Sequence, residues 1–315
     1  MEARAIGIDV GGTKIAGVRA TAGGVVEARA TAPTPAEDQE RTFAEIVRIA
    51  RELRTPEVRA AGVGAAGLVT WPGGVIPFAP NNPWRGFPLR ERLEAATGLP
   101  CVVDNDAAVA ALAEHRFGAG RGTADMLLVT VGTGIGGGII AGGRPFRGAH
   151  GFAAEVGHVI VEPGGPRCGC GNLGCWEQVA SGTAIERAAR RVVAGWPRSL
   201  LARLAEGDPE RVDGALVTRA AREGDEAAVG ILAEVGRRLG EGIAGLVNIL
   251  DPELVVVGGG AVEAGDLLLE PARRAFAAAV EAREHRPEVP IVPAALGPEA
   301  GAVGAAALAL DGAGA

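Results

Sequence analysis

The sequence predicts an α/β protein of two domains, and three observations support that prediction. The chain has 315 residues, more than the size at which one hydrophobic core usually stops growing. Short apolar segments typical of strands alternate with segments of helical periodicity. A strand, a Gly/Thr turn and a second strand occur twice, around 6–18 and again around 127–141. This weak repeat indicates two domains of related topology.

Composition and charge exclude several classes of protein. Hydrophobic residues make up 48% of the chain, enough to fill two cores, and the formal net charge is −7 with both signs interspersed. A nucleic-acid surface would instead show a clustered basic patch. No apolar run reaches the roughly 18 residues that cross a bilayer, and the first residues lack the pattern of a signal peptide. We therefore expect a cytoplasmic protein without nucleic-acid or membrane partners.

The first part of the chain alternates predicted strands with predicted helices. Apolar residues three and four positions apart, such as Phe43, Ile46 and Val47, indicate a helix, and Gly98 and Gly118 follow the ends of two others. The predicted strands cover 4–10, 14–21, 25–31, 58–65 and 100–103, and the predicted helices cover 43–53, 89–97 and 105–117.

A glycine-rich stretch at 118–124 marks the predicted domain boundary, and the chain beyond it is mostly helical. The predicted strands of this part cover 125–131, 139–140, 254–257 and 291–292, with a glycine turn at 132–138. The predicted helices cover 181–195, 214–223, 225–250, 267–282 and 299–310.

The first glycine turn, Asp9-Val-Gly-Gly-Thr-Lys14, has the residues of a phosphate site without the spacing of a Walker loop. Gly11 and Gly12 would let backbone amides approach a phosphate, and Thr13 adds a hydroxyl donor. Asp9 could hold magnesium or its water shell, and Lys14 could direct its charge at the phosphates. An ordinary hairpin with a solvated lysine is the alternative that this motif alone leaves open.

Two further glycine clusters have the character of backbone sites for a nucleotide. Gly132-Thr-Gly-Ile-Gly-Gly-Gly138 contains a Gly-x-Gly-x-x-Gly match, but a dinucleotide fold needs a helix next and a strand follows here. A second phosphate-binding hairpin therefore fits better. Gly258-Gly-Gly260 follows a buried strand, which suits either close approach to a nucleotide or a tight strand-to-helix turn.

Asp104-Asn-Asp106 lies where a predicted strand meets a predicted helix. Asp and Asn cap helices, and we expect one of the three to do so. A cap needs only one residue, however, which leaves polar groups for chemistry. A sugar hydroxyl needs a carboxylate to accept its proton during phosphoryl transfer, and an adjacent amide can orient the ring by donating and accepting at once.

His158, Cys168, Cys170 and Cys175 form a Cys3His set, the strongest local signal in the chain. Three thiolates and one imidazole are a tetrahedral zinc set, and four protein ligands leave no position for substrate water. A disulfide or free thiols are the alternatives, and a cytosolic chain favours the metal. Cys101 stands alone in an apolar strand and is expected in the core.

Two glutamates lie next to this zinc loop in the sequence. Glu155 precedes His158 by three residues, and Glu177 follows Cys175 by two. Rigidly held carboxylates accept charge-assisted hydrogen bonds from sugar hydroxyls. Taken without the neighbouring motifs, both are more simply read as surface acids.

Together these motifs resemble the ROK family, whose name covers repressors, open reading frames and kinases. The resemblance covers nearly the whole chain and is most specific at Cys168-Gly-Cys-Gly-Asn-Leu-Gly-Cys-Trp-Glu177, with Glu155-Val-Gly-His158 upstream. Ala79-Pro-Asn-Asn-Pro-Trp84 resembles the sugar-side segment of the family. Position 82 is usually apolar there, so Asn82 is a departure and we favour Asn81 as the residue that faces the sugar.

The resemblance implies the actin-like (ribonuclease H-like) fold of two domains around a cleft. The implied N-terminal domain covers 1–118 and 299–315, and the C-terminal domain covers 119–298. The implied activity is ATP-dependent phosphorylation of a hexose, with Mg²⁺ and a structural Zn²⁺. Family members are commonly homodimers or homotetramers.

The resemblance also implies a role for each matching residue. Asp106 is the implied catalytic base and also contacts the sugar, and His158 binds the sugar and zinc at the same time. The other implied sugar ligands are Gly67, Asn81, Asn105, Glu155 and Glu177. The implied nucleotide and phosphate ligands are Asp9, Gly11, Gly12, Thr13, Lys14, Thr133, Gly134, Gly136, Gly258, Gly259 and Gly260.

Two questions remain: which sugar is phosphorylated, and whether the protein is a kinase or belongs to another class. We expect the 6-hydroxyl of glucose to be the acceptor, with fructose, mannose, allose and N-acetylmannosamine as alternatives. A sugar-sensing repressor would carry a helix-turn-helix domain before the first glycine turn, and Asp9 leaves no room for one. A non-kinase actin-like ATPase would not need the zinc loop or its two glutamates.

Overall fold

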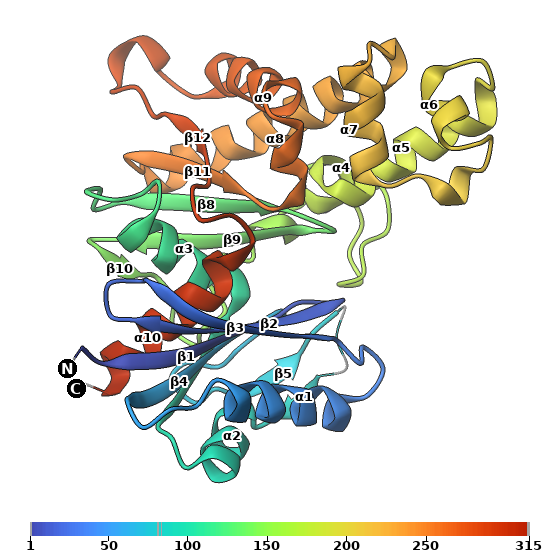
Figure 1. Ribbon diagram of the computed structural model, residues 1–315. Coiled ribbons are helices and arrows are strands. Elements are labelled where there is room, and N and C mark those ends of the chain that lie inside the picture. Colours follow the sequence, from blue (N-terminus) through green and yellow to red (C-terminus); the bar gives the residue numbers. More distant parts are fainter. Residues whose placement is uncertain (1, 81, 83, 314–315) are drawn as a thin grey trace. The chain divides into compact units, whose positions relative to one another are not determined.

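The computed structural model describes residues 2–80, 82 and 84–313 (Figure 1). The chain forms two compact units. The first comprises Met1–Leu128, Gly137–Glu155 and Ala294–Ala315, and the second comprises Val129–Gly136 and Val156–Pro293. The predicted domains also return the C-terminal segment to the first part. They differ in placing 119–128, 137–155 and 294–298 in the second.

The first unit is built on a five-stranded sheet of order β3-β2-β1-β4-β7. β1 pairs antiparallel with β2 and parallel with β4, and β4 pairs parallel with β7. These strands are β1 (Arg4–Val10), β2 (Lys14–Thr21), β3 (Val26–Pro33), β4 (Val58–Ala65) and β7 (Cys101–Asn105). A short antiparallel pair, β5 (Ile76–Phe78) and β6 (Arg85–Phe87), was not predicted from the sequence.

Helices cover both faces of this sheet. The helices of the first unit are α1 (Gln39–Glu52), α2 (Leu89–Thr97), α3 (Asp106–Phe117) and α10 (Ala300–Ala313). α1 buries Ile46 and Ile49 against one face, and α10, red in Figure 1, lies against β1 and β4 on the other. A Cβ on Gly7 or Gly62 would lie within 2 Å of a carbonyl oxygen of α10. The helix backbone therefore rests directly on the strands.

A second five-stranded sheet has the order β10-β9-β8-β11-β12. Its strands are β8 (Met126–Val131), β9 (Ile135–Ala141), β10 (Arg144–Pro145), β11 (Leu254–Gly258) and β12 (Ile291–Pro293). The predicted turn at 132–138 is wrong beyond Gly134, because β9 begins at Ile135. Gly138 lies in β9 against α3, where a Cβ would meet the carbonyl oxygen of Ala107 at 2.6 Å. Close packing, not turning, requires that glycine.

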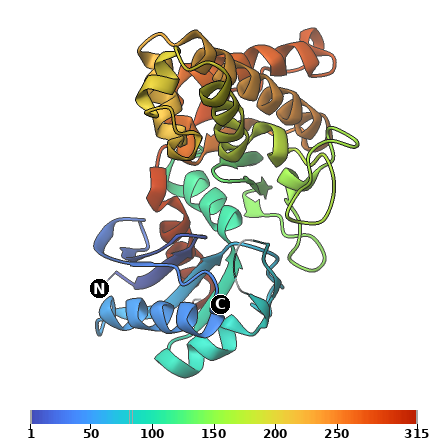
Figure 2. The same ribbon diagram turned by 90° about the vertical axis from the view of Figure 1, so that its right-hand side faces the viewer.

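Outside its strands the second unit is mostly helical, and α8 is its longest helix (Figure 2). Helices α4, α5, α7 and α9 all pack against α8. The helices are α4 (Glu177–Ala180), α5 (Gly182–Gly195), α6 (Leu200–Leu204), α7 (Gly214–Arg222), α8 (Glu226–Leu250) and α9 (Asp266–Ala279). The side chains that cap four of them are Ser181, Ser199, Asp213 and Asp225. Within the described part of the chain, no helix combines the length and the apolar character needed to cross a membrane.

Candidate functional site

The first glycine turn joins β1 to β2 and is closed by a hydrogen bond from the Gly11 amide to the Lys14 carbonyl, at 3.1 Å. Gly12, Thr13 and Lys14 are exposed at the tip. Asp9 is the last but one residue of β1, and its side chain is partly buried. The turn therefore presents amides, a hydroxyl and an ammonium beside a carboxylate, as the sequence predicted.

Asp9 occupies an electrostatically unfavourable position. Its carboxylate packs on α10, where a Cβ at position 301 would lie 2.7 Å from the Asp9 Cγ, so the glycine at that position leaves it room. Burial and, to a smaller extent, the charge of Asp106 raise the pKa of Asp9 to about 7, and the charge of Lys14 opposes this shift. A group in this position gains from a bound cation, which would stabilise its ionised form.

Asp104, Asn105 and Asp106 have three different roles at the end of β7. Asn105 caps α3, because its side-chain oxygen accepts from the amides of Ala107 at 2.9 Å and Ala108 at 3.1 Å. Its side-chain nitrogen donates to the Gly67 carbonyl at 3.2 Å. The expected cap is therefore the Asn105 amide, and its second N–H has no partner among the described residues, so it could bind a further ligand.

Asp104 is buried and paired, whereas Asp106 is not paired. Asp104 accepts from Arg147 Nε at 2.7 Å, and the Arg147 guanidinium lies 3.7 Å over the Trp71 ring. Burial raises the pKa of Asp104, and Arg147 opposes that shift. Burial also raises the pKa of Asp106, opposed only by backbone hydrogen bonds, and Asp106 makes no ion pair with the described residues. Asp106 is thus the carboxyl of this group that suits proton transfer.

The segment proposed to face the sugar is described only in part. Asn81 lies outside the described residues. Asn82 is 4% exposed, and neither atom of its side-chain amide has a hydrogen-bond partner among the described residues. Trp84 is fully buried and packs against Phe87 at a tilt of 49°, with ring centroids 4.8 Å apart. A buried amide without partners is costly, so Asn82 is a second candidate for a ligand contact besides the predicted Asn81.

In the second unit, the second glycine turn lines a cavity of about 420 Å³. The turn is closed by a hydrogen bond from the Gly132 amide to the Gly134 carbonyl at 3.0 Å. The start of α5 holds it, since the Gly182 amide donates to the Gly132 carbonyl and the Thr183 hydroxyl to the Thr133 carbonyl. The Gly258–Gly260 cluster also reaches this cavity through Gly260. The volume falls in the range of small-ligand pockets.

Several residues that line this cavity were not predicted. They come from α5, α7 and the loop before it, and from the turn after β11. These residues are Thr183, Ile185, Glu186, Asp213, Gly214, Ala215, Thr218, Ala261 and Glu263. In the sequence they read only as parts of amphipathic helices and their caps, so no motif could have marked them.

The four residues of the Cys3His set come together in the second unit. Their candidate ligand atoms all lie within 4.8 Å of one another. Cys170 Sγ lies 3.6 Å from Cys175 Sγ, and Cys168 Sγ lies 3.6 Å from His158 Nδ1. Ligands about 2.3 Å from a tetrahedral ion are separated by roughly 3.7 Å, so the set has the dimensions of a metal site. The sulfurs are too far apart for a disulfide.

Glu177 links this loop to the second glycine turn. Its Oε1 accepts from the Cys168 thiol at 2.9 Å and lies 3.9 Å from His158 Nδ1. Its Oε2 lies against the turn, where a Cβ on Gly134 would approach it to 2.4 Å. A side chain at position 134 would therefore displace the carboxylate.

The predicted site residues divide between the two units. The first unit holds the residues from Asp9 to Lys14, Gly67, Asn105, Asp106 and Glu155. The second unit holds Thr133, Gly134, Gly136, His158, the three loop cysteines, Glu177 and Gly258–Gly260. Gly136 lies in β9, beyond the turn itself. The predicted residues therefore form two sets, one in each unit.

Comparisons with known proteins show the family of the chain. A family model described as the ROK family matches residues 5–312. The chain belongs to the ROK family. Among its relatives is a glucokinase of Streptomyces coelicolor, 42% identical over 310 residues that make up 97% of each chain.

Two solved structures of ROK proteins match this one along its length. One is a ROK family glucokinase from Streptomyces griseus in complex with glucose and AMPPNP, with a TM-score of 0.91 and 42% identity. The match covers 98% of this chain and 99% of that one. The other is a ROK hexokinase from Thermus thermophilus, with a TM-score of 0.78 and 38% identity over 98% of each chain. The predicted actin-like α/β fold is therefore confirmed.

One buried carboxylate of this ROK protein was not singled out in the sequence. Glu114 on α3 is fully buried, and it accepts from the backbone amides of Ala119 at 2.9 Å, Ala295 at 3.1 Å and Leu296 at 2.8 Å. Ala119 lies where the chain leaves α3 toward β8, and 295–296 lie where it returns to α10. One side chain thus holds both connecting segments to the helix that begins at Asp106.

Glu114→Gln should lower the free energy of unfolding by about 1–3 kcal/mol, because the amide replaces one acceptor oxygen with a donor that faces backbone N–H groups. Urea unfolding followed by circular dichroism measures the change. Glu52→Gln, at an exposed surface ion pair on α1, is the control and should stay within about 0.5 kcal/mol. Equal effects of the two substitutions would contradict the role of Glu114.

The stability of the ligand-free protein should depend on pH through Asp9. The folded pKa of about 7 lies above the ordinary value of 3.8, so the folded state holds a proton that the unfolded state has released. The contribution of Asp9 to the free energy of unfolding is complete below about pH 4. It is lost as the pH rises through about 7, at a rate of at most about 1.4 kcal/mol per pH unit. Asp9→Asn should remove it. Urea unfolding of both proteins at pH 5 and pH 8, without added magnesium, tests this; an identical pH dependence would contradict it.

Proposed function

We propose that this chain is an ATP-dependent kinase that transfers the γ-phosphoryl group to the 6-hydroxyl of glucose. The observation that carries the proposal is Asp106, a carboxylate of raised pKa that follows a strand and makes no ion pair with the described residues, in a chain that belongs to the ROK family. The likeness to the Streptomyces griseus glucokinase, solved with glucose and AMPPNP, supports the choice of both substrates.

Asp106 acts as the general base. Its carboxylate accepts the proton of the attacking hydroxyl while the γ-phosphoryl group transfers. A raised pKa brings the carboxylate closer to the pH at which the enzyme works, so that it holds the proton more readily in the transition state. The amide of Ala107 donates to Asp106 Oδ1 at 2.9 Å and keeps the carboxylate oriented.

The nucleotide binds through backbone groups more than through charged side chains. In the second unit, the turn around Thr133 holds phosphate oxygens, and the cavity between α5, α7 and Gly260 accepts the nucleoside. In the first unit, the turn from Gly11 to Lys14 supplies further phosphate donors. Magnesium, when bound, neutralises the charge that develops on the phosphates, and Asp9 is the residue placed to hold it or its water shell.

The sugar is held by amides and carboxylates. Asn105 has one N–H left after capping α3, and the buried Asn82 amide needs partners that sugar hydroxyls would supply. Four further sugar ligands are proposed because of the resemblance to the ROK family. They are Glu155, His158, Glu177 and Gly67. Asn81 stays a prediction, because it lies outside the described residues.

The Cys3His loop binds one structural zinc ion. The donor set and the spacing of its atoms support zinc over other metals, since three thiolates and an imidazole suit this ion. The thiols must lose their protons to bind, which frees Glu177 from the hydrogen bond of Cys168. Bound zinc would hold His158 through its imidazole, and the Glu177 carboxylate would then be available for substrate.

ATP-dependent phosphorylation of a panel of sugars tests the proposed function, with glucose expected to give the highest kcat/KM against fructose, mannose, allose and N-acetylmannosamine. Asp106→Asn should lower kcat on glucose by about 10²–10⁴-fold with little change in glucose affinity, because only the base is lost. Asp38→Asn, which keeps an N-cap of α1, is the control and should retain normal kcat. Normal turnover by Asp106→Asn would remove Asp106 from the base role.

Elemental analysis should find about one zinc ion per chain, and chelation should lower the melting temperature, because metal affinity contributes to folding. Cys170→Ala should lose the zinc. Cys101→Ala, a free cysteine of the first unit's core, should keep it. A protein that is metal-free and equally stable with intact cysteines would refute the zinc site.

A further inference from the structure

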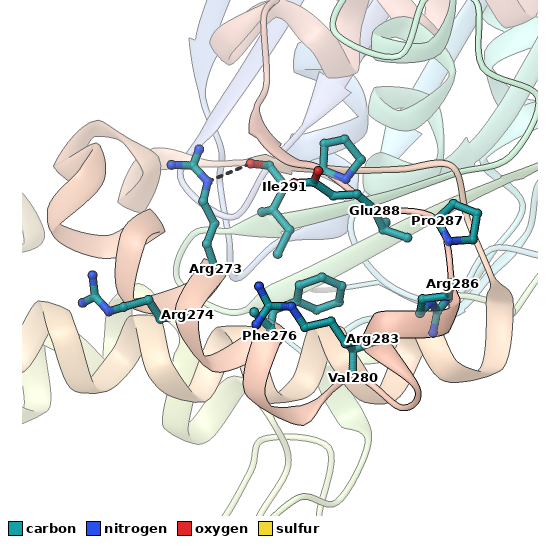
Figure 3. A pocket seen from close by; sticks show the side chains of 12 residues that line it. Arg273, Arg274, Phe276, Val280, Arg283, Arg286, Pro287, Glu288 and Ile291 are labelled. Carbon is teal, nitrogen blue, oxygen red and sulfur yellow. Dashed lines mark hydrogen bonds between the residues drawn. The ribbon is translucent and has the colours of Figure 1, made fainter.

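A cavity of about 660 Å³ lies in the second unit between α9 and the chain that leads into β12 (Figure 3). It shares no lining residue with the cavity around Thr133. Its volume is within the range of pockets that hold small ligands. None of the predicted substrate, nucleotide or metal residues lines it, so the proposed kinase activity gives it no role.

The floor of this cavity is apolar. Phe276 and Val280 come from α9 and its end, and Val289 and Ile291 come from the chain opposite. Each of the four is between 5% and 9% exposed, so they form the edge of the core. A ligand with an apolar body would cover this edge and gain roughly 25 cal/mol for each Å² removed from water.

Four arginines line the same cavity against a single acid, Glu288. Two of them are held in place. Arg273 Nε donates to the Ile291 carbonyl at 3.0 Å, and its Nη1 pairs with Glu270 and Asp266. Arg286 donates to Asp251 at 2.8 Å and to Asn248 at 3.3 Å. The acids that pair with these two arginines do not themselves line the cavity.

The donors of the other arginines are not used. Within the part of the chain that the structure describes, Arg274 and Arg283 make no hydrogen bond or ion pair. The buried Nε of Arg286 also lacks an acceptor among the described residues. Figure 3 shows Arg283 extending along the cavity beside Phe276. An anion bound above the apolar floor would supply hydrogen-bond acceptors to these guanidinium donors.

We propose that this cavity binds a small organic anion, with a phosphate or carboxylate head on the arginines and an apolar body on Phe276 and Ile291. Arginine is suited to the head group because its planar fork donates two parallel hydrogen bonds to either anion. Binding needs both the anionic head and the apolar body. Arg274 and Arg283 are exposed to water, and the floor alone offers no polar partner. The site is additional to those for sugar and nucleotide.

Isothermal titration of the zinc-loaded protein tests the proposal, with glucose and AMPPNP present at saturation to occupy the other sites. Phenyl phosphate and benzoate carry both a head and an apolar body, and they distinguish the two head groups. Inorganic phosphate carries only the head, and phenol only the body. At least one of the first pair should bind about tenfold more tightly than either fragment.

Two sets of variants locate the binding. The double substitution Arg274→Gln with Arg283→Gln should weaken it about tenfold or more and leave kinase activity unchanged. Arg198→Gln, an exposed arginine of the same unit outside the cavity, is the matched control and should have no effect. Glu288→Gln removes the one acid from the lining and should tighten binding several-fold.

The proposal is overturned if no probe binds, or if the double variant binds as well as the unchanged protein. It is also overturned if Glu288→Gln weakens the binding of the anions. These outcomes are independent of the kinase assay, because none of the altered residues belongs to the proposed active site.

Discussion

The close approach of α10 to the first sheet is the constraint on which the catalytic arrangement of the first unit depends. Gly7 and Gly62 let the helix backbone rest on β1 and β4, because any side chain there would overlap a carbonyl oxygen of α10. The glycine at position 301 leaves room for the Asp9 carboxylate at the end of β1. A helix held one side chain farther away would expose Asp9 to solvent and remove the cause of its raised pKa.

Burial also separates the roles of the carboxylates beside β7. Asp104 and Asp106 both have raised pKa values through burial, but only Asp104 is compensated by an arginine, Arg147. An ion pair of this kind keeps Asp104 ionised and structural. Asp106 has backbone donors alone, which leaves it free to exchange a proton. Two neighbours of the same residue type therefore differ in chemistry because their surroundings differ.

In the second unit, the stretch from Glu177 to Thr183 contacts both the Cys3His loop and the second glycine turn. Glu177 contacts Cys168 with one oxygen and lies against Gly134 with the other, and Thr183, six residues later, holds the carbonyl of Thr133. The geometry of the turn is therefore coupled to the state of the cysteines. In the proposed function, a structural metal bound here would set the position of His158 and Glu177, the two proposed sugar ligands of this loop.

The sequence by itself determined most of the strands, but not the short pair β5 and β6. It also determined the two glycine turns, the Cys3His set and the polar triplet at 104–106, because each depends on residue type and on spacing along the chain. The sequence also determined where most helices begin or end, because a glycine or a capping side chain lies at that position. It placed the second turn wrongly beyond Gly134, since glycines required for packing against a helix look the same as glycines required for a turn. Only the tertiary structure decided which carboxylate of the triplet is paired, that Glu114 holds both connecting segments, and that four arginines surround one cavity. These features depend on contacts between residues far apart in the chain, and burial and the distances between charges exist only once the chain is folded.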